Sequence, residues 1–224
     1  MVAAPSSCLM FAGPTLHRAM AMATLDLRGI TVLPPVKRGD VTRLLDSDRP
    51  GTLVVVDGYF HLENLSVGHL ELRTAMKLGW RVWGLSSMGA IRACEMHHIG
   101  MKGFGEIFEM YCRDPDFRDD EVALMHEPGP PYLEVTEPLV HMRRALDQLA
   151  ADGVITDDHR RHIVDRLMSL WFGERTLPLL QQMALECAPG REPEIGAWTA
   201  DFDRFRVKSH DLIKFLAERP WIDS

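Results

Sequence analysis

The sequence predicts an α/β protein, with a mainly parallel sheet flanked by helices and an α-helical C-terminal part. In the first half, short apolar runs bounded by turn residues alternate with amphipathic stretches, which is typical of βαβ units in a parallel sheet. From about Val135 the pattern changes to long helical periodicity without strand candidates. We therefore expect an α/β core over residues 1–130 and a helical region over residues 131–224.

Short runs rich in β-branched and apolar residues predict the strands. Thr52–Val56 is the clearest, and because it is apolar on both faces we expect it near the centre of the sheet. The other expected strands are Cys8–Ala12, Gly29–Leu33, Trp80–Leu85 and a short Glu121–His126. Three glycines, Gly100, Gly103 and Gly105, predict a loop.

Helical patterns connect these strands. Asp40 takes an N-cap position before Val41–Leu45, and a helix that begins at Ser66 or Val67 is closed by Gly79. Another helix begins near Met88. The helices expected in the C-terminal region are Leu139–Ala151, His159–Phe172, Leu177–Cys187 and Phe202–Leu216.

Composition narrows the class of protein. The 224 residues are 46% hydrophobic and 25% charged, with a net charge of −7, so one good core can form but no basic footprint for nucleic acid is visible. No apolar run approaches the roughly 20 residues that span a bilayer. The four cysteines are far apart and lack zinc or disulfide spacing. We expect a reduced, cytoplasmic protein with no membrane partner, no metal site and no cofactor.

The clearest candidate for chemistry follows a predicted strand. Ser87 stands at a strand-to-helix turn, where a nucleophile is exposed and the N–H of Met88 can serve as an oxyanion donor. Gly89 supplies half of a G-x-S-x-G elbow. The alternative is that Ser86 or Ser87 only caps the helix.

A nucleophilic serine needs a base. His126, at the end of the short predicted strand, is the first candidate, and His69 is the rival. Asp57 ends a buried strand, where a carboxylate is energetically costly unless it is paired or hydrogen-bonded. It could orient the base, hold the Ser87 loop or bind a cation.

Other polar residues are weaker candidates. Gly58 and Tyr59 follow Asp57 at the strand end, where ligands of open parallel sheets bind. Arg92 and Glu95 are three positions apart and could simply pair with each other. Asp120 belongs to an acidic turn that could also orient the base. Gly13–Leu16 resembles a phosphate-binding loop only weakly, because it lacks the P-loop lysine.

Eight segments between residues 9 and 130 form a more specific pattern than any single motif. They are Met10–Leu16, Leu33–Pro35 with Arg38–Asp40, Val56–Phe60, His69–Glu71, Ser86–Ala93, Gly100–Met101 with Gly103, Ile107–Phe108, and Asp119–Ala123 with His126. In this order they resemble the TfuA-like family, with the departure that Cys94 stands where the family often has alanine. A shorter similarity joins Ser86–Ala90 and Leu124–Pro128 to the serine and histidine contexts of ClpP peptidases.

The resemblance implies a partner of YcaO enzymes, which use ATP to activate a peptide-bond oxygen so that sulfur can replace it in ribosomally made peptides. It also implies sulfur transfer, through serine hydrolase-like cleavage of a thiocarboxylated ThiS-like carrier protein. The precursor peptide could be a further partner. Ser87 would be the nucleophile, His126 the base, and Asp57 or Asp120 the residue that orients it. The rival hypotheses are a non-catalytic module that docks on a YcaO enzyme and a nucleotide-binding protein that uses Gly13–Leu16.

Overall fold

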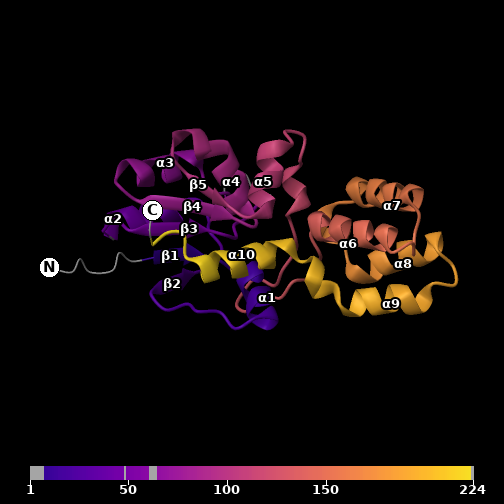
Figure 1. Cartoon of the computed structure of the whole chain (residues 1–224). Coiled ribbons are helices and arrows are strands. Elements are labelled where there is room, and N and C mark those ends of the chain that lie inside the picture. Colours follow the sequence, from indigo (N-terminus) through magenta and orange to yellow (C-terminus); the bar gives the residue numbers. More distant parts are fainter. Residues whose placement is uncertain (1–7, 48, 61–64, 223–224) are drawn as a thin grey trace. The chain divides into compact units, whose positions relative to one another are not determined.

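The computed structural model describes residues 8–47, 49–60 and 65–222, which divide into two units (Figure 1). The first unit comprises the described residues up to Phe117 together with those from Lys208 onward, and the second is Arg118–Val207. Each unit has its own apolar core. The division predicted from the sequence, an α/β core over residues 1–130 and a helical region over residues 131–224, stays a prediction.

The first unit is built on a five-stranded parallel sheet with the order β2-β1-β3-β4-β5. Its strands are β1 (Cys8–Phe11), β2 (Ile30–Leu33), β3 (Thr52–Val55), β4 (Arg81–Leu85) and β5 (Lys102–Phe104). The four residues of β3 are all buried, and β3 is the central strand, as its apolar sequence predicts. The predicted α/β fold is confirmed.

Helices cover both faces of this sheet. They are α1 (Pro14–Met22), α2 (Asp40–Ser47), α3 (His69–Lys77), α4 (Met88–Met96), α5 (Glu106–Arg113) and α10 (Val207–Glu218). Residues of α2, α3 and α4 share a core with Leu53 and Val55, whereas α1 and α10 share a core with Met10 and Val54 on the opposite face. The yellow α10 accordingly lies beside the indigo α1 in Figure 1. The C-terminal helix thus completes the second layer of the sheet.

Two polar contacts fix α10 to the carboxyl ends of the strands. The hydroxyl of Ser86, after β4, donates a 2.8 Å hydrogen bond to the carbonyl oxygen of Lys208. The carboxylate of Asp211 accepts hydrogen bonds from the N–H groups of Glu106 (2.8 Å) and Ile107 (3.0 Å), at the start of α5. These N–H groups have no partner within α5, because they belong to its first turn.

Two segments differ from the prediction. The expected glycine loop contains the edge strand β5, and the helix α5 follows it. Glu121–His126 is not a strand: Asp119–Glu121 forms a 3-10 turn, and His126 makes only an isolated bridge with Glu134. The Met125 N–H donates to the hydroxyl of Thr136 instead of to a backbone carbonyl oxygen, so the backbone pairing does not extend beyond the bridge.

The second unit is helical. Its helices are α6 (Leu139–Ala151), α7 (Asp157–Ser169), α8 (Leu177–Cys187) and α9 (Glu192–Ala200), with 3-10 turns at Phe172–Glu174 and Phe202–Phe205. The helix α9 was not predicted, and the predicted helix over Phe202–Leu216 is divided into a 3-10 turn and α10.

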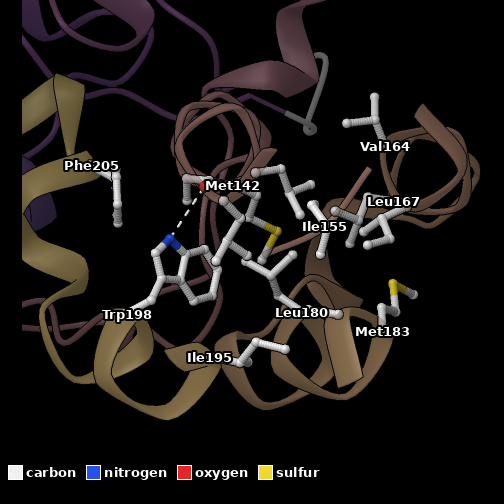
Figure 2. Packing of buried hydrophobic residues seen from close by; sticks show 14 of the residues in the cluster. Met142, Ile155, Val164, Leu167, Leu180, Met183, Ile195, Trp198 and Phe205 are labelled. Atoms are coloured by element: carbon white, nitrogen blue, oxygen red, sulfur yellow. Dashed lines mark hydrogen bonds between the residues drawn. The ribbon is translucent and has the colours of Figure 1, made fainter. Parts of the chain in front are cut away.

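One apolar core joins the four helices of this unit. Figure 2 shows Met142, Leu167, Leu180 and Trp198, one from each helix, converging on it. The indole N–H of Trp198 donates a 3.2 Å hydrogen bond to the carbonyl oxygen of Ala145, so the buried ring is also satisfied as a donor (Figure 2). Across residues 8–47, 49–60 and 65–222, the helices are too short or too polar to span a bilayer.

Candidate functional site

The strand order places three candidate segments at one edge of the sheet. The chain winds outward in opposite directions from β1 and β3, and such a reversal opens a crevice beyond the carboxyl ends of the two strands. Gly13 follows β1, Asp57 follows β3, and Ser87 follows the neighbouring strand β4. The first unit therefore collects these residues where open parallel sheets bind ligands.

Asp57 is buried and fully engaged with the first turn of α1. Its Oδ2 accepts hydrogen bonds from the N–H groups of Gly13 (2.8 Å) and Thr15 (3.1 Å), and its Oδ1 accepts one from the Thr15 hydroxyl (2.6 Å). The carboxylate thus holds the loop after β1, not the Ser87 loop. It also occupies the place where a phosphate would bind the α1 amides, which argues against the nucleotide-binding hypothesis for Gly13–Leu16.

The turn between β4 and α4 is strained. The N–H of Ser87 donates a 2.7 Å hydrogen bond to the carbonyl oxygen of Leu85, two residues earlier, and Ser86 between them has a φ of +64°. A γ-turn with positive φ is rare in proteins, and strained backbone gathers at functional sites. The strain falls on Ser86, whose hydroxyl is bound to Lys208. Ser86 is thus an anchoring residue.

Ser87 occupies the N-cap position of α4 without capping it. Within the described part of the chain, its side chain makes no hydrogen bond to the first turn of the helix. The Ser86 hydroxyl points to α10, so neither serine fulfils the capping alternative. Within the residues that the structure describes, the N–H of Met88 has no hydrogen-bond acceptor. An N–H that is to stabilise an oxyanion must be unoccupied in this way. Ser87 is only 2% exposed, so a substrate reaches it only after its surroundings move.

Two glycines let α4 approach the strand ends. A Cβ on Gly89 would lie 1.8 Å from the carbonyl oxygen of Val55, and its N–H donates to Val56 (3.2 Å). A Cβ on Gly58 would lie 2.8 Å from Val36 and 3.0 Å from Met88. Close packing therefore explains why both positions are glycine. Their predicted roles in binding stay predictions.

His69, Arg92 and Glu95 form a cluster on α3 and α4. Glu95 Oε2 contacts His69 Nε2 at 2.8 Å and Arg92 Nη1 at 2.7 Å, so the pairing that their spacing indicated is present. The Arg92 Nε donates to the carbonyl oxygen of Val67 at 3.1 Å. Glu95 is eight residues beyond Ser87, about 12 Å along the helix axis. The structure thus brings the His69 ring to Glu95, two turns away from Ser87.

Tyr59 lies next to Gly58 with its ring under the Lys37 ammonium, 4.9 Å from the ring centroid. Its carbonyl oxygen accepts a 2.6 Å hydrogen bond from the hydroxyl of Ser66. Partial burial raises the pKa of the Tyr59 phenol, and the negative charge of Asp40 adds to this effect. The phenol is therefore a hydrogen-bonding group in its neutral form.

His126 lies in the second unit on the exposed segment before Pro128. Its Nδ1 is 2.6 Å from the carbonyl oxygen of Glu127, and its ring packs edge-on against Tyr132. A carbonyl oxygen only accepts, so Nδ1 carries the proton and Nε2 is the basic nitrogen of the neutral ring. This tautomer suits a general base. Because Ser87 belongs to the first unit, its pairing with His126 stays a prediction.

Asp120 is part of a partly buried ionic cluster of the second unit. Its Oδ2 accepts from Arg175 at 2.7 Å and from Arg118 at 2.8 Å. The fully buried Arg175 also donates to the carbonyl oxygens of Leu167 (3.0 Å), Leu170 (2.9 Å) and Asp120 (2.9 Å). A carboxylate that neutralises a buried guanidinium has a structural role.

A second buried cluster was not anticipated from the sequence. Glu137 contacts His141 Nδ1 at 2.6 Å and Arg206 Nη2 at 2.9 Å, and Arg206 also pairs with Asp203. Burial pushes the pKa of Glu137 upward, but the hydrogen bond and charge of His141, together with Arg206, outweigh it and hold this pKa below its usual value. The i,i+4 spacing of Glu137 and His141 was the only sequence signal.

These features define a doubly wound α/β protein with a strained serine turn at the carboxyl edge of its sheet, joined to a helical unit with buried ion pairs. Comparison with protein families matches residues 57–176, more than half of the chain, to the TfuA-like proteins. The chain belongs to the TfuA-like family, as its motifs predicted. The matched region contains Asp57, Ser87 and His126. No curated protein matches the sequence.

Proposed function

We propose that this protein is an accessory protein of YcaO-dependent peptide thioamidation, which releases sulfide by hydrolysing a thiocarboxylated ThiS-like carrier protein. Membership of the TfuA-like family supports the accessory role and the association with a YcaO enzyme. The observation that supports hydrolysis is the strained turn after β4. It leaves the Ser87 side chain uninvolved in capping, next to the N–H of Met88.

In the first step, the Ser87 Oγ attacks the carbonyl carbon of the thiocarboxylate. The serine proton passes to the base, negative charge builds on the carbonyl oxygen, and the N–H of Met88 at the positive end of α4 stabilises it. The C–S bond then breaks, and the sulfur leaves as hydrogensulfide with the proton from the base. An acyl ester on Ser87 remains.

Water completes the cycle. The base removes a proton from water, which attacks the ester carbon, and the C–O bond to Ser87 breaks as the serine oxygen recovers a proton. The products are the restored hydroxyl and a carrier with an ordinary carboxyl group, which releases the remaining proton of the water as it ionises, with no change of oxidation state.

His126 is the base in this proposal. The carbonyl oxygen of Glu127 holds its Nδ1–H and so makes Nε2 the proton acceptor. Asp57 and Asp120 were predicted to orient the base, but their partners are the first turn of α1 and Arg175. In the proposal they keep these elements in place.

The test uses purified full-length chain, a thiocarboxylated carrier and a sulfide assay. Ser87→Ala and His126→Asn should each lower the rate of sulfide release by about 100-fold or more, because each removes a group that acts in the transition state. The matched controls are Ser169→Ala and His162→Asn on α7, which should release sulfide at the parent rate. A Ser87→Ala protein as fast as the parent would exclude the hydrolytic mechanism.

The second candidate function is a non-catalytic module that docks on a YcaO enzyme and activates it. The second unit favours it, because large apolar side chains are exposed there at Leu133 (44%), Val135 (61%) and Trp171 (56%). An assay of precursor-peptide thioamidation with added free sulfide distinguishes the two candidate functions. A hydrolase becomes dispensable under that condition, whereas an activating module is still required, and Ser87→Ala activates as well as the parent.

A further inference from the structure

Two thiols lie side by side on neighbouring helices of the first unit. The sulfur atoms of Cys94, in α4, and Cys112, in α5, are 3.0 Å apart. Both helices belong to the same compact unit and pack against each other. Cys112 is exposed, and Cys94 is half-buried. Neither residue takes part in the proposed sulfide release.

We propose that Cys94 and Cys112 form a reversible disulfide and so constitute a redox modification site of this protein. A disulfide bond is about 2.05 Å long, so the two sulfurs need to approach by about 1 Å. Small rotations of two side chains achieve this without separating or unfolding the helices. The bond would close a short loop through β5, because the two positions are 18 residues apart.

The different exposure of the two thiols sets the order of the reaction. Burial, followed by the hydrogen bond with Cys112, raises the pKa of the Cys94 thiol to about 12, which makes Cys94 a poor first nucleophile. Cys112 is the thiol that meets a reagent from solvent. Cys94 then attacks the sulfur of Cys112 itself, at short range, once that sulfur is bonded to the reagent.

The oxidant is a small-molecule disulfide such as oxidised glutathione. The Cys112 thiolate attacks one of its sulfurs, forms a mixed disulfide and expels one thiolate. The Cys94 sulfur then attacks the Cys112 sulfur, forms the internal disulfide and expels the second thiolate. Two protein thiols are oxidised, one small disulfide is reduced to two thiols, and the protons of Cys94 and Cys112 pass to these products.

The other two cysteines provide controls. Cys8 is buried in β1, and Cys187 lies in α8 of the second unit. Burial raises the pKa of the Cys187 thiol, as it does for Cys94. Unlike Cys94, Cys187 has no neighbouring cysteine in the described chain. Cys187→Ser should therefore leave the reaction of the pair unchanged.

The experiment treats the reduced full-length chain with oxidised glutathione, blocks the remaining thiols by alkylation and maps the peptides by mass spectrometry. The expected product is a monomer in which Cys94 and Cys112 are linked and which dithiothreitol restores. Cys94→Ser should stop at a glutathione adduct on Cys112, and Cys112→Ser should give neither adduct nor link. The proposal is overturned if the parent also stops at the adduct or does not react.

Thermal unfolding checks that the link forms in the folded protein. A disulfide that closes a short loop in native geometry should raise the Tm of the oxidised protein by roughly 5 °C or more relative to the reduced protein. The oxidised Cys187→Ser protein should show the same rise. A lower Tm after oxidation would mean that the link distorts the packing of α4 and α5, and it would overturn the proposal of a native redox site.

Discussion

The hydroxyl of Ser86 is hydrogen-bonded at 2.8 Å to the carbonyl oxygen of Lys208, which follows it by 122 positions in the chain. Ser86 is completely buried and has a φ of +64°. Its side chain therefore ties the strained turn after β4 to the first turn of α10. Through this bond, the last helix of the chain helps to fix the conformation in which Ser87 begins α4.

Substitutions of Ser86 separate the hydrogen bond from the strain. Ser86→Ala loses a buried hydrogen bond and should lower the free energy of unfolding by about 1–3 kcal/mol. Ser86→Gly loses the same bond but removes the cost of a positive φ, about 1 kcal/mol. We expect the glycine variant to be the more stable of the two in urea unfolding. The reverse order would show that the turn is not strained.

Gly89→Ala tests the close approach of α4 to the sheet. The added Cβ would lie 1.8 Å from the carbonyl oxygen of Val55, so the start of α4 must shift. The free energy of unfolding should fall by about 3 kcal/mol or more, as in overpacked cores. Gly196→Ala in α9 is the matched control. A Cβ there meets nothing within 4 Å, and alanine favours a helix by about 1 kcal/mol, so this variant should be stabilised. Equal effects in the two urea curves would contradict this packing.

Local sequence signals predicted most of the sheet. The strands β1, β3 and β4 are apolar runs that end at turn residues, and the pattern needs no knowledge of distant segments. The strand β5 was missed because it has three residues, one of them Gly103, and lies at an edge of the sheet. The place of α10 was also missed. Its periodicity indicates a buried face, but it does not tell which surface covers that face.

For the candidate site, too, the local sequence pattern does not reveal which distant segments come into contact. The sequence indicated that Asp57 must be bonded at the end of a buried strand, yet its partners Gly13 and Thr15 lie more than 40 positions earlier. The position of Ser87 at a helix start followed from local pattern alone. The strain at Ser86 did not, because neither a positive φ at serine nor a hydrogen bond to the distant Lys208 has a signature in the local sequence pattern.

Asp57 should stabilise the first turn of α1 in proportion to the acceptors it supplies. Asp57→Ala removes the acceptors of three buried donors and should cost about 3 kcal/mol or more of unfolding free energy. Asp57→Asn keeps one oxygen for the N–H groups of Gly13 and Thr15, and its amide can donate to the Thr15 hydroxyl. It should cost only about 1 kcal/mol. Urea unfolding in which both variants lose the same amount would contradict this role.

Arg175 should be essential for the second unit. Its guanidinium makes four hydrogen bonds in a fully buried place, and a lysine has neither the planar fork nor the number of donors to replace them. Arg175→Lys should lower the free energy of unfolding by about 3–5 kcal/mol. Hydrogen exchange should show lost protection in α7 and α8. Arg191→Lys, at an exposed pair with Glu194, is the control and should change stability by less than about 0.5 kcal/mol.

Asp211 predicts how stability depends on pH. Burial raises the pKa of its carboxyl from 3.8 to about 6, although the N–H groups of Ile107 and Glu106 act in the opposite direction. The folded protein therefore binds this proton more tightly than the unfolded chain does. The contribution of Asp211 to stability is greatest below pH 4 and falls as the pH rises to about 6, by up to about 3 kcal/mol in total.

Asp211→Asn isolates this contribution, because the amide keeps the shape of the side chain but does not titrate. Urea unfolding of parent and variant between pH 4 and pH 7 gives the difference between their free energies of unfolding at each pH. The contributions of the other titrating groups cancel in this difference. The parent should lose stability relative to the variant as the pH rises from 4 to 6, and the difference should then stay constant. A difference that is flat, or that grows in favour of the parent, would mean that the folded protein holds Asp211 ionised at pH 4, with the N–H groups of α5 outweighing the cost of burial.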